Sequence, residues 1–73
     1  MKLNLTDKDL QLIRDAGIPF DINKDYDFWD LDEILNEIYF NESVNVEHDD
    51  YLADLYGDLA DKIEDQRAVV YGR

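Results

Sequence analysis

Side chains with an oxygen atom recur at regular positions between residues 21 and 32. Counted from Asp21, loop positions 1, 3, 5, 7 and 12 carry such side chains: Asp21, Asn23, Asp25, Asp27 and Asp32. An EF-hand loop places its calcium ligands at these positions. One hypothesis is therefore an EF-hand-like calcium site in this segment.

Two features of the same segment favour a turn that caps a helix. The sixth position of an EF-hand loop needs glycine, and here it is Tyr26, which would have to adopt a costly left-handed backbone. Gly17 and Pro19 also end the preceding helix several residues before the loop begins. We therefore expect aspartate caps and no bound metal, with the calcium loop as the alternative.

A second set of carboxylates occurs near the C-terminus of the chain. At about 100° per residue, four aspartates share one helix face opposite Leu59 and Ile63. These are Asp54, Asp58, Asp61 and Asp65. Their spacing along the axis would be roughly 4.5 to 6 Å, close to that of phosphates along a nucleic-acid strand. Such a face could imitate DNA, although solubility alone would also explain it.

The choice of aspartate favours a binding role for this face. Aspartate forms helices less well than glutamate, and like charges four residues apart destabilise a helix by a few tenths of a kcal/mol. Nevertheless, 14 of the 19 acidic residues are aspartates. A second acidic face is expected on the preceding helix, at Asp30, Glu33 and Glu37. Phe40 lies off that helix's apolar face and either anchors a partner or covers the end of the bundle.

Residues suited to catalysis are few. His48 is the only histidine, cysteine is absent, and Thr6 is better explained as a helix cap. Carboxylates without a pocket do not make an acid–base site. We expect a protein that is not an enzyme and that needs no cofactor.

The charge of the chain restricts its partners. Its 73 residues include 19 acidic and 7 basic ones, which gives a net charge of −12 at pH 7. This charge repels nucleic-acid backbones and anionic membranes and attracts basic proteins, including nucleic-acid-binding ones. No segment approaches the ~18 apolar residues of a membrane span, and the first residues lack a signal-peptide pattern. A cytoplasmic protein is the expectation.

Three amphipathic helices are predicted, at residues 7–16, 28–41 and 50–67. Thr6 and Asp9 form a capping box at the start of the first helix, and Gly17 ends it. For the second helix, Asp27 and Asp30 are competing N-caps. Between the second and third helices, Val44 and Val46 alternate with polar residues, so a short extended pairing is possible there.

Burial of three apolar helix faces against one another gives an all-α, small three-helix bundle that forms a single domain. Phe20 and Ile22 are expected to pack beneath an ordered, aromatic-containing loop between the first two helices. Gly57, inside the third helix, indicates a close neighbour such as another helix or the Trp29 ring. Residues 68–73 have no predicted conformation, and the chain is either a monomer or a homodimer.

The first half of the chain resembles short, uncharacterised acidic helical proteins of Gram-positive bacteria that are often carried by phages or mobile elements. The similar positions are a Gly-Ile-x-Phe-Asp turn followed by Lys-Asp-Tyr: Gly17, Ile18, Phe20, Asp21, Lys24, Asp25 and Tyr26. This sequence differs from the pattern at Pro19 and Trp29. The resemblance implies no function, but it favours helix entry over a calcium loop.

These observations predict a small acidic protein-binding module that engages a basic surface of another protein. Its sharper form is a DNA mimic that inhibits a nucleic-acid-binding protein. A calcium-binding module and a structural homodimer are the alternatives.

Overall fold

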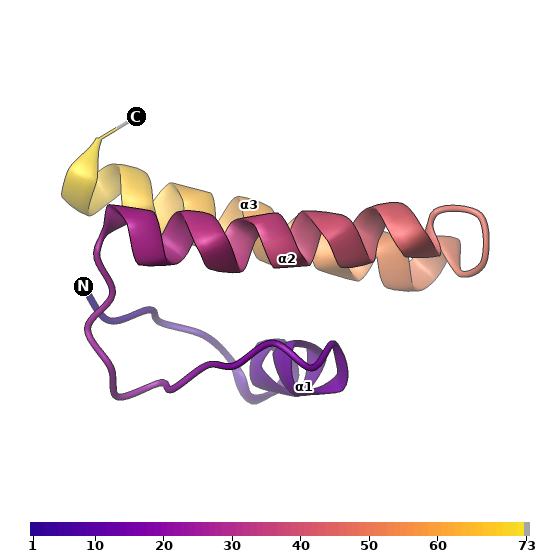
Figure 1. Ribbon diagram of the computed structural model, residues 1–73, viewed down its shortest axis with the longest axis horizontal. Helices are drawn as coiled ribbons and strands as arrows, with labels where there is room; N and C mark the ends of the chain where they lie inside the picture. Colours follow the sequence, from indigo (N-terminus) through magenta and orange to yellow (C-terminus); the bar gives the residue numbers. More distant parts are fainter. Residues whose placement is uncertain (73) are drawn as a thin grey trace.

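The computed structural model describes residues 1–72 and has three α-helices: α1 (Asp7–Asp15), α2 (Phe28–Asn45) and α3 (Asp50–Tyr71). Helices α2 and α3 run antiparallel along each other, and the shorter α1 lies to one side of this pair (Figure 1). The predicted all-α three-helix bundle is confirmed.

The core lies where the apolar faces of the helices meet. Its most deeply buried large side chains come from α2 and α3: Leu31, Leu35, Ile38, Leu59 and Ile63. Helix α1 adds Leu12 and Ile13 to the same cluster. Each fully buried aliphatic side chain of this size contributes about 1.5 to 3 kcal/mol, so the predicted apolar faces hold the bundle together.

Helix α1 begins and ends as its sequence predicts. The Thr6 hydroxyl accepts a hydrogen bond from the Asp9 backbone (3.1 Å), and the Asp9 carboxylate accepts one from the Thr6 backbone (3.0 Å). At the other end, Gly17 has a φ of +73°, and the Ile18 N–H donates to the Ile13 carbonyl at 3.1 Å. This pattern is a Schellman C-cap, which places Ile18 back on the core.

The N-cap of α2 is Asp27, which exchanges side-chain to backbone hydrogen bonds with Asp30. Trp29 therefore falls within the first turn, where 72% of it is exposed. The suggestion that the Trp29 ring explains Gly57 is wrong. A Cβ atom at Gly57 would instead meet the end of the Glu42 side chain, which comes from α2.

Helices α2 and α3 are both longer than predicted. Val44 belongs to α2 and Val46 is its C-cap, so the extended pairing of these valines is wrong. Helix α3 continues to Tyr71, whose hydroxyl donates to the Tyr26 carbonyl at 2.8 Å. The ring of Tyr71 also packs edge-on against Phe28. These tertiary contacts extend α3 beyond its amphipathic part.

The N-terminal segment and the connection between α1 and α2 are ordered by contacts with each other and with α3. Met1 and Tyr26 pair through their backbones, with a Tyr26 N–H to Met1 carbonyl distance of 2.7 Å. The backbone of Asn4 exchanges two hydrogen bonds of 2.8 Å with the Gln66 side chain. Phe20 packs against the core as predicted, but Ile22 is 37% exposed. The expectation for Ile22 is therefore wrong.

Candidate functional site

The acidic stripe of α3, defined as Asp54, Asp58, Asp61 and Asp65, lies on the outside of the bundle. All four residues are exposed, whereas Leu59, Ala60 and Ile63 on the other side of the helix are buried. Because all four share one helix face, their carboxylates form a row along α3. The structure thus groups the four residues as the sequence predicted.

The basic side chains of α3 are directed away from the acidic stripe. Lys62 donates to the Asp9 carboxylate of α1 at 2.6 Å. Arg67 reaches Asp32 of α2 at 3.4 Å and lies over the Phe28 ring at 4.3 Å. Within residues 1–72, no ion pair involves Asp54, Asp58 or Asp61. The negative charge of these three residues therefore faces solvent.

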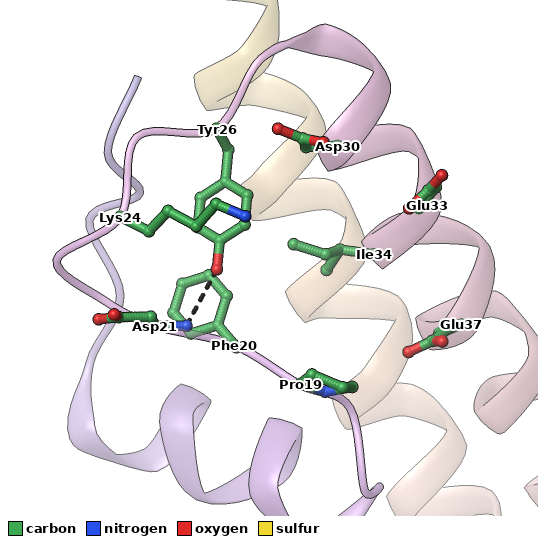
Figure 2. Close-up of a pocket in the computed structure, with 9 residues that line it drawn as sticks. All are labelled: Pro19, Phe20, Asp21, Lys24, Tyr26, Asp30, Glu33, Ile34 and Glu37. Carbon is green, nitrogen blue, oxygen red and sulfur yellow. Dashed lines mark hydrogen bonds between the residues drawn. The ribbon is translucent and has the colours of Figure 1, made fainter.

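The predicted carboxylates of α2, namely Asp30, Glu33 and Glu37, line a different part of the molecule. They form one wall of an open hollow of about 440 Å³ between α2 and the 19–26 connection (Figure 2). Glu33 and Glu37 are exposed, and Asp30 is half-buried. No residue of α3 lines this hollow. The two acidic sets thus lie on different helices, and only the α2 set borders this hollow.

The opposite wall of this hollow is aromatic. The rings of Phe20 and Tyr26 stack with centroids 5.4 Å apart and planes 5° from parallel. The Tyr26 hydroxyl is fixed because it accepts the Asp21 N–H at 2.9 Å. Lys24 crosses the Tyr26 ring, with its ammonium 5.1 Å from the ring centroid and on the side of α2 (Figure 2). The hollow thus combines an aromatic wall, an acidic wall and a cation from the chain itself.

Sequence reasoning missed this combination. It treated Phe20 as core and Lys24 and Tyr26 as parts of a helix entry. The only local signal was the spacing of Lys24 two residues before a tyrosine. The stacking depends on contacts between distant residues, such as Met1 with Tyr26, which a local pattern does not reveal.

The oxygen donors of the proposed calcium loop do not converge. The Asp21 carboxylate accepts the Asn23 N–H at 2.8 Å, Asp27 caps α2, and Asp32 pairs with Arg67. Among residues 1–72, no non-glycine residue has a positive φ, so Tyr26 does not supply the turn that an EF-hand loop needs. The described residues also contain no group of three or more histidines and acids able to hold a metal ion. The described residues thus do not bring the side chains of the proposed loop together around one point, and calcium binding stays an untested alternative for Asp21, Asn23, Asp25, Asp27 and Asp32.

Phe40 is 67% exposed. It borders a second hollow, of about 390 Å³, between α2 and the end of α1, with Ile18 on the other side. Glu37 lines both hollows, so the two follow the same edge of α2. Both interpretations of Phe40, as a partner anchor and as a cover of the bundle end, stay predictions.

Two titratable groups link the helices. Burial would raise the pKa of Asp9, but hydrogen bonds from Lys62 and Thr6 outweigh it and lower this pKa below 3.8. Partial burial, the hydrogen bond to Glu64 and the charges of Glu64 and Asp61 raise the pKa of Tyr39 to about 12. Both groups thus hydrogen-bond to a residue of α3.

Comparisons with protein-family models, with curated proteins and with solved structures find no match to this chain. Over residues 1–72, the helices lack the combination of length and apolar character that crossing a membrane requires.

Proposed function

We propose that this protein is a cytoplasmic protein-binding module whose acidic stripe on α3 engages a basic surface of another protein. The observation that carries the proposal is the row of exposed aspartates on the side of α3 that faces neither α1 nor α2. A row of like charges destabilises its own helix. An opposing basic surface would relieve this repulsion and would be drawn toward the stripe at long range.

The arrangement of the cations supports the same proposal. Lys62 and Arg67 neutralise Asp9 and Asp32, at the contacts of α3 with α1 and α2. The charge left uncompensated at Asp54, Asp58 and Asp61 lies on the surface that a partner can reach. Internal pairing therefore reduces charge within the bundle while the outer face of α3 stays negative.

The sharper form of the proposal is a DNA mimic. Residues three and four apart on α3 are separated by roughly 4.5 to 6 Å along the axis, so the stripe presents a straight row of charges with a phosphate-like spacing. Its partner would then be a nucleic-acid-binding protein, as expected for an inhibitor carried by a phage or mobile element.

The proposal is tested by capture of proteins on the immobilised chain. Extract from a Gram-positive bacterium, the source that the sequence resemblance indicates, is passed over wild type and over Asp58→Asn with Asp61→Asn. Asp15→Asn with Glu47→Gln is the control, because it removes the same charge from exposed residues outside the stripe. Retained proteins are identified by mass spectrometry and eluted with salt and with double-stranded DNA.

The expected result is a basic protein that wild type and the control retain and that the stripe variant releases at lower salt. Elution by DNA supports the mimic in particular. Equal retention by all three forms, with the same salt dependence, would contradict a role for the stripe.

A further inference from the structure

We propose that the hollow between Phe20, Tyr26 and the α2 carboxylates binds an arginine side chain of the basic partner, and that Lys24 holds this place in the free protein. This inference rests on the proposed function, because it assumes a basic partner. It concerns a different surface from the acidic stripe, since no α3 residue lines the hollow.

A cation of the chain itself already lies in the hollow. The Lys24 ammonium lies 5.1 Å from the centroid of the Tyr26 ring, within the distance of about 6 Å at which a cation and an aromatic face attract each other. Lys24 itself is exposed and belongs to a connection rather than a helix. The Lys24 backbone N–H donates to the Asp21 carbonyl at 3.1 Å, whereas its side chain makes no hydrogen bond or ion pair among residues 1–72. The position of this side chain therefore shows that the hollow accepts a cation.

The aromatic wall of the hollow suits a planar cation. The planes of the Phe20 and Tyr26 rings lie within 5° of parallel. Tyr26 is only 6% exposed, its hydroxyl accepts the Asp21 N–H, and its backbone N–H donates to the Met1 carbonyl, so the ring is held in place. A guanidinium is planar, stacks on aromatic faces and is less strongly hydrated than an ammonium. An arginine is consequently the better ligand for this wall, and it would displace Lys24.

The charge of the α2 wall also favours a cationic ligand in the hollow. Within residues 1–72, the Glu33 and Glu37 carboxylates make no hydrogen bond or ion pair, and both line the hollow opposite the aromatic rings (Figure 2). A guanidinium that stacks on one wall can direct its N–H donors toward carboxylates on the other. The two walls thus favour the same chemical group in one orientation.

The test uses a probe with a single cation, so that binding elsewhere on an acidic protein does not dominate. N-acetyl-arginine amide is titrated into the ¹⁵N-labelled full chain, and dissociation constants are taken from amide chemical shifts. N-acetyl-citrulline amide, which has nearly the same shape but no charge, is the control ligand. Shifts of the Lys24, Tyr26 and Glu37 amides with arginine and not with citrulline are expected.

Two variants, each with a matched control, predict the direction in which arginine binding changes. Lys24→Ala removes the competing cation and should tighten arginine binding roughly two- to fivefold, the worth of an exposed cation–π contact. Lys8→Ala makes the same charge change on the exposed surface of α1 and should change binding less. Glu37→Gln should weaken binding roughly two- to fivefold, whereas Glu47→Gln, an exposed glutamate outside the hollow, should not.

The inference is overturned if Lys24→Ala tightens binding no more than Lys8→Ala, or if arginine and citrulline shift the same amides equally. The stripe variant Asp58→Asn with Asp61→Asn separates this result from the proposed function. If that variant loses its captured partner while the hollow fails these tests, only the arginine site is wrong. If capture does not depend on the stripe but arginine binds in the hollow, only the role of the stripe is wrong.

Discussion

At the residue scale, Asp9 both caps a helix and forms an ion pair with another helix. Its carboxylate accepts from the Thr6 backbone at 3.0 Å and from Lys62 at 2.6 Å, so one side chain closes the first turn of α1 and ties that helix to α3. Only 12% of the carboxylate-bearing side chain is exposed, although its lysine partner is 40% exposed. Solvent screening weakens the ion pair between Lys62 and Asp9. The capping hydrogen bond between Asp9 and the Thr6 backbone therefore contributes more of the stability.

Asp9→Asn should lower the free energy of unfolding at neutral pH by about 1 kcal/mol. The pKa of Asp9 is lowered in the folded state from 3.8, so its contribution is fully present above that pH. The contribution is lost as the pH falls through the lower, folded-state pKa. Urea unfolding of both proteins across pH measures the difference. A gap that stays constant down to the lowest pH at which wild type folds would refute this account, and Asp7→Asn in the same turn is the control.

The contact between Tyr39 and Glu64 should contribute stability with the opposite pH dependence, in the alkaline range. The pKa of Tyr39 is raised to about 12, so the hydroxyl bonded to Glu64 of α3 stays protonated above pH 10, the ordinary value for tyrosine. Any stability from this contact is present below pH 10 and is lost as the pH rises toward the folded-state pKa. Glu64→Gln should bring the titration of Tyr39, read as tyrosinate absorbance against Tyr39→Phe, to lower pH. No change in the titration would show that Glu64 does not cause the shift.

At the element scale, two glycines should respond in opposite ways to the same substitution. Gly17 has a φ of +73° with nothing near its missing Cβ, so alanine there meets only the cost of the left-handed backbone. We expect Gly17→Ala to destabilise the fold by about 1 to 2 kcal/mol.

Gly57 is helical, and a Cβ there contacts only the flexible end of Glu42. Gly57→Ala should stabilise the fold by up to about 1 kcal/mol as the helix gains propensity and Glu42 turns aside. Urea unfolding measures both variants. Destabilisation by Gly57→Ala would mean that Glu42 is held in place.

The start of α1 could be predicted, and that of α2 could be narrowed to a cap at Asp27 or Asp30, because the causes are local. Thr6 with Asp9, and Asp27 with Asp30, each close a turn within three residues of sequence. The helix ends were harder, because no glycine or proline follows residue 41 where α2 was expected to stop. Tyr71 extends α3 through contacts with Tyr26 and Phe28, which are distant in sequence. The C-terminal end of α3 therefore depends on long-range contacts that local sequence patterns do not reveal.

At the scale of the whole molecule, the net charge of −12 should make stability depend on salt. Self-repulsion is screened over about 8 Å at physiological ionic strength. The melting temperature should rise from low to moderate salt, and it should rise less for Asp58→Asn with Asp61→Asn. A melting temperature indifferent to salt would mean that the surface charges are locally compensated.

Of the two parts of the candidate site, the acidic stripe could be predicted from the sequence and the hollow could not. The acidic stripe follows from helical periodicity within one element, and the four aspartates do share an exposed face. The hollow forms only because the connection of residues 19–26 lies against α2, with the Lys24 side chain over the Tyr26 ring. The position of α1 and the N-terminal segment decides that arrangement, and no spacing of residues encodes it.

Amide chemical shifts of the ¹⁵N-labelled protein, recorded while the captured basic protein is added, test the role of the acidic stripe most directly. We predict that the largest changes and losses of signal map to residues 54–65 of α3 and weaken with added salt. Changes confined to α1 and the 46–49 turn, with α3 unaffected, would contradict binding through the outer face of α3.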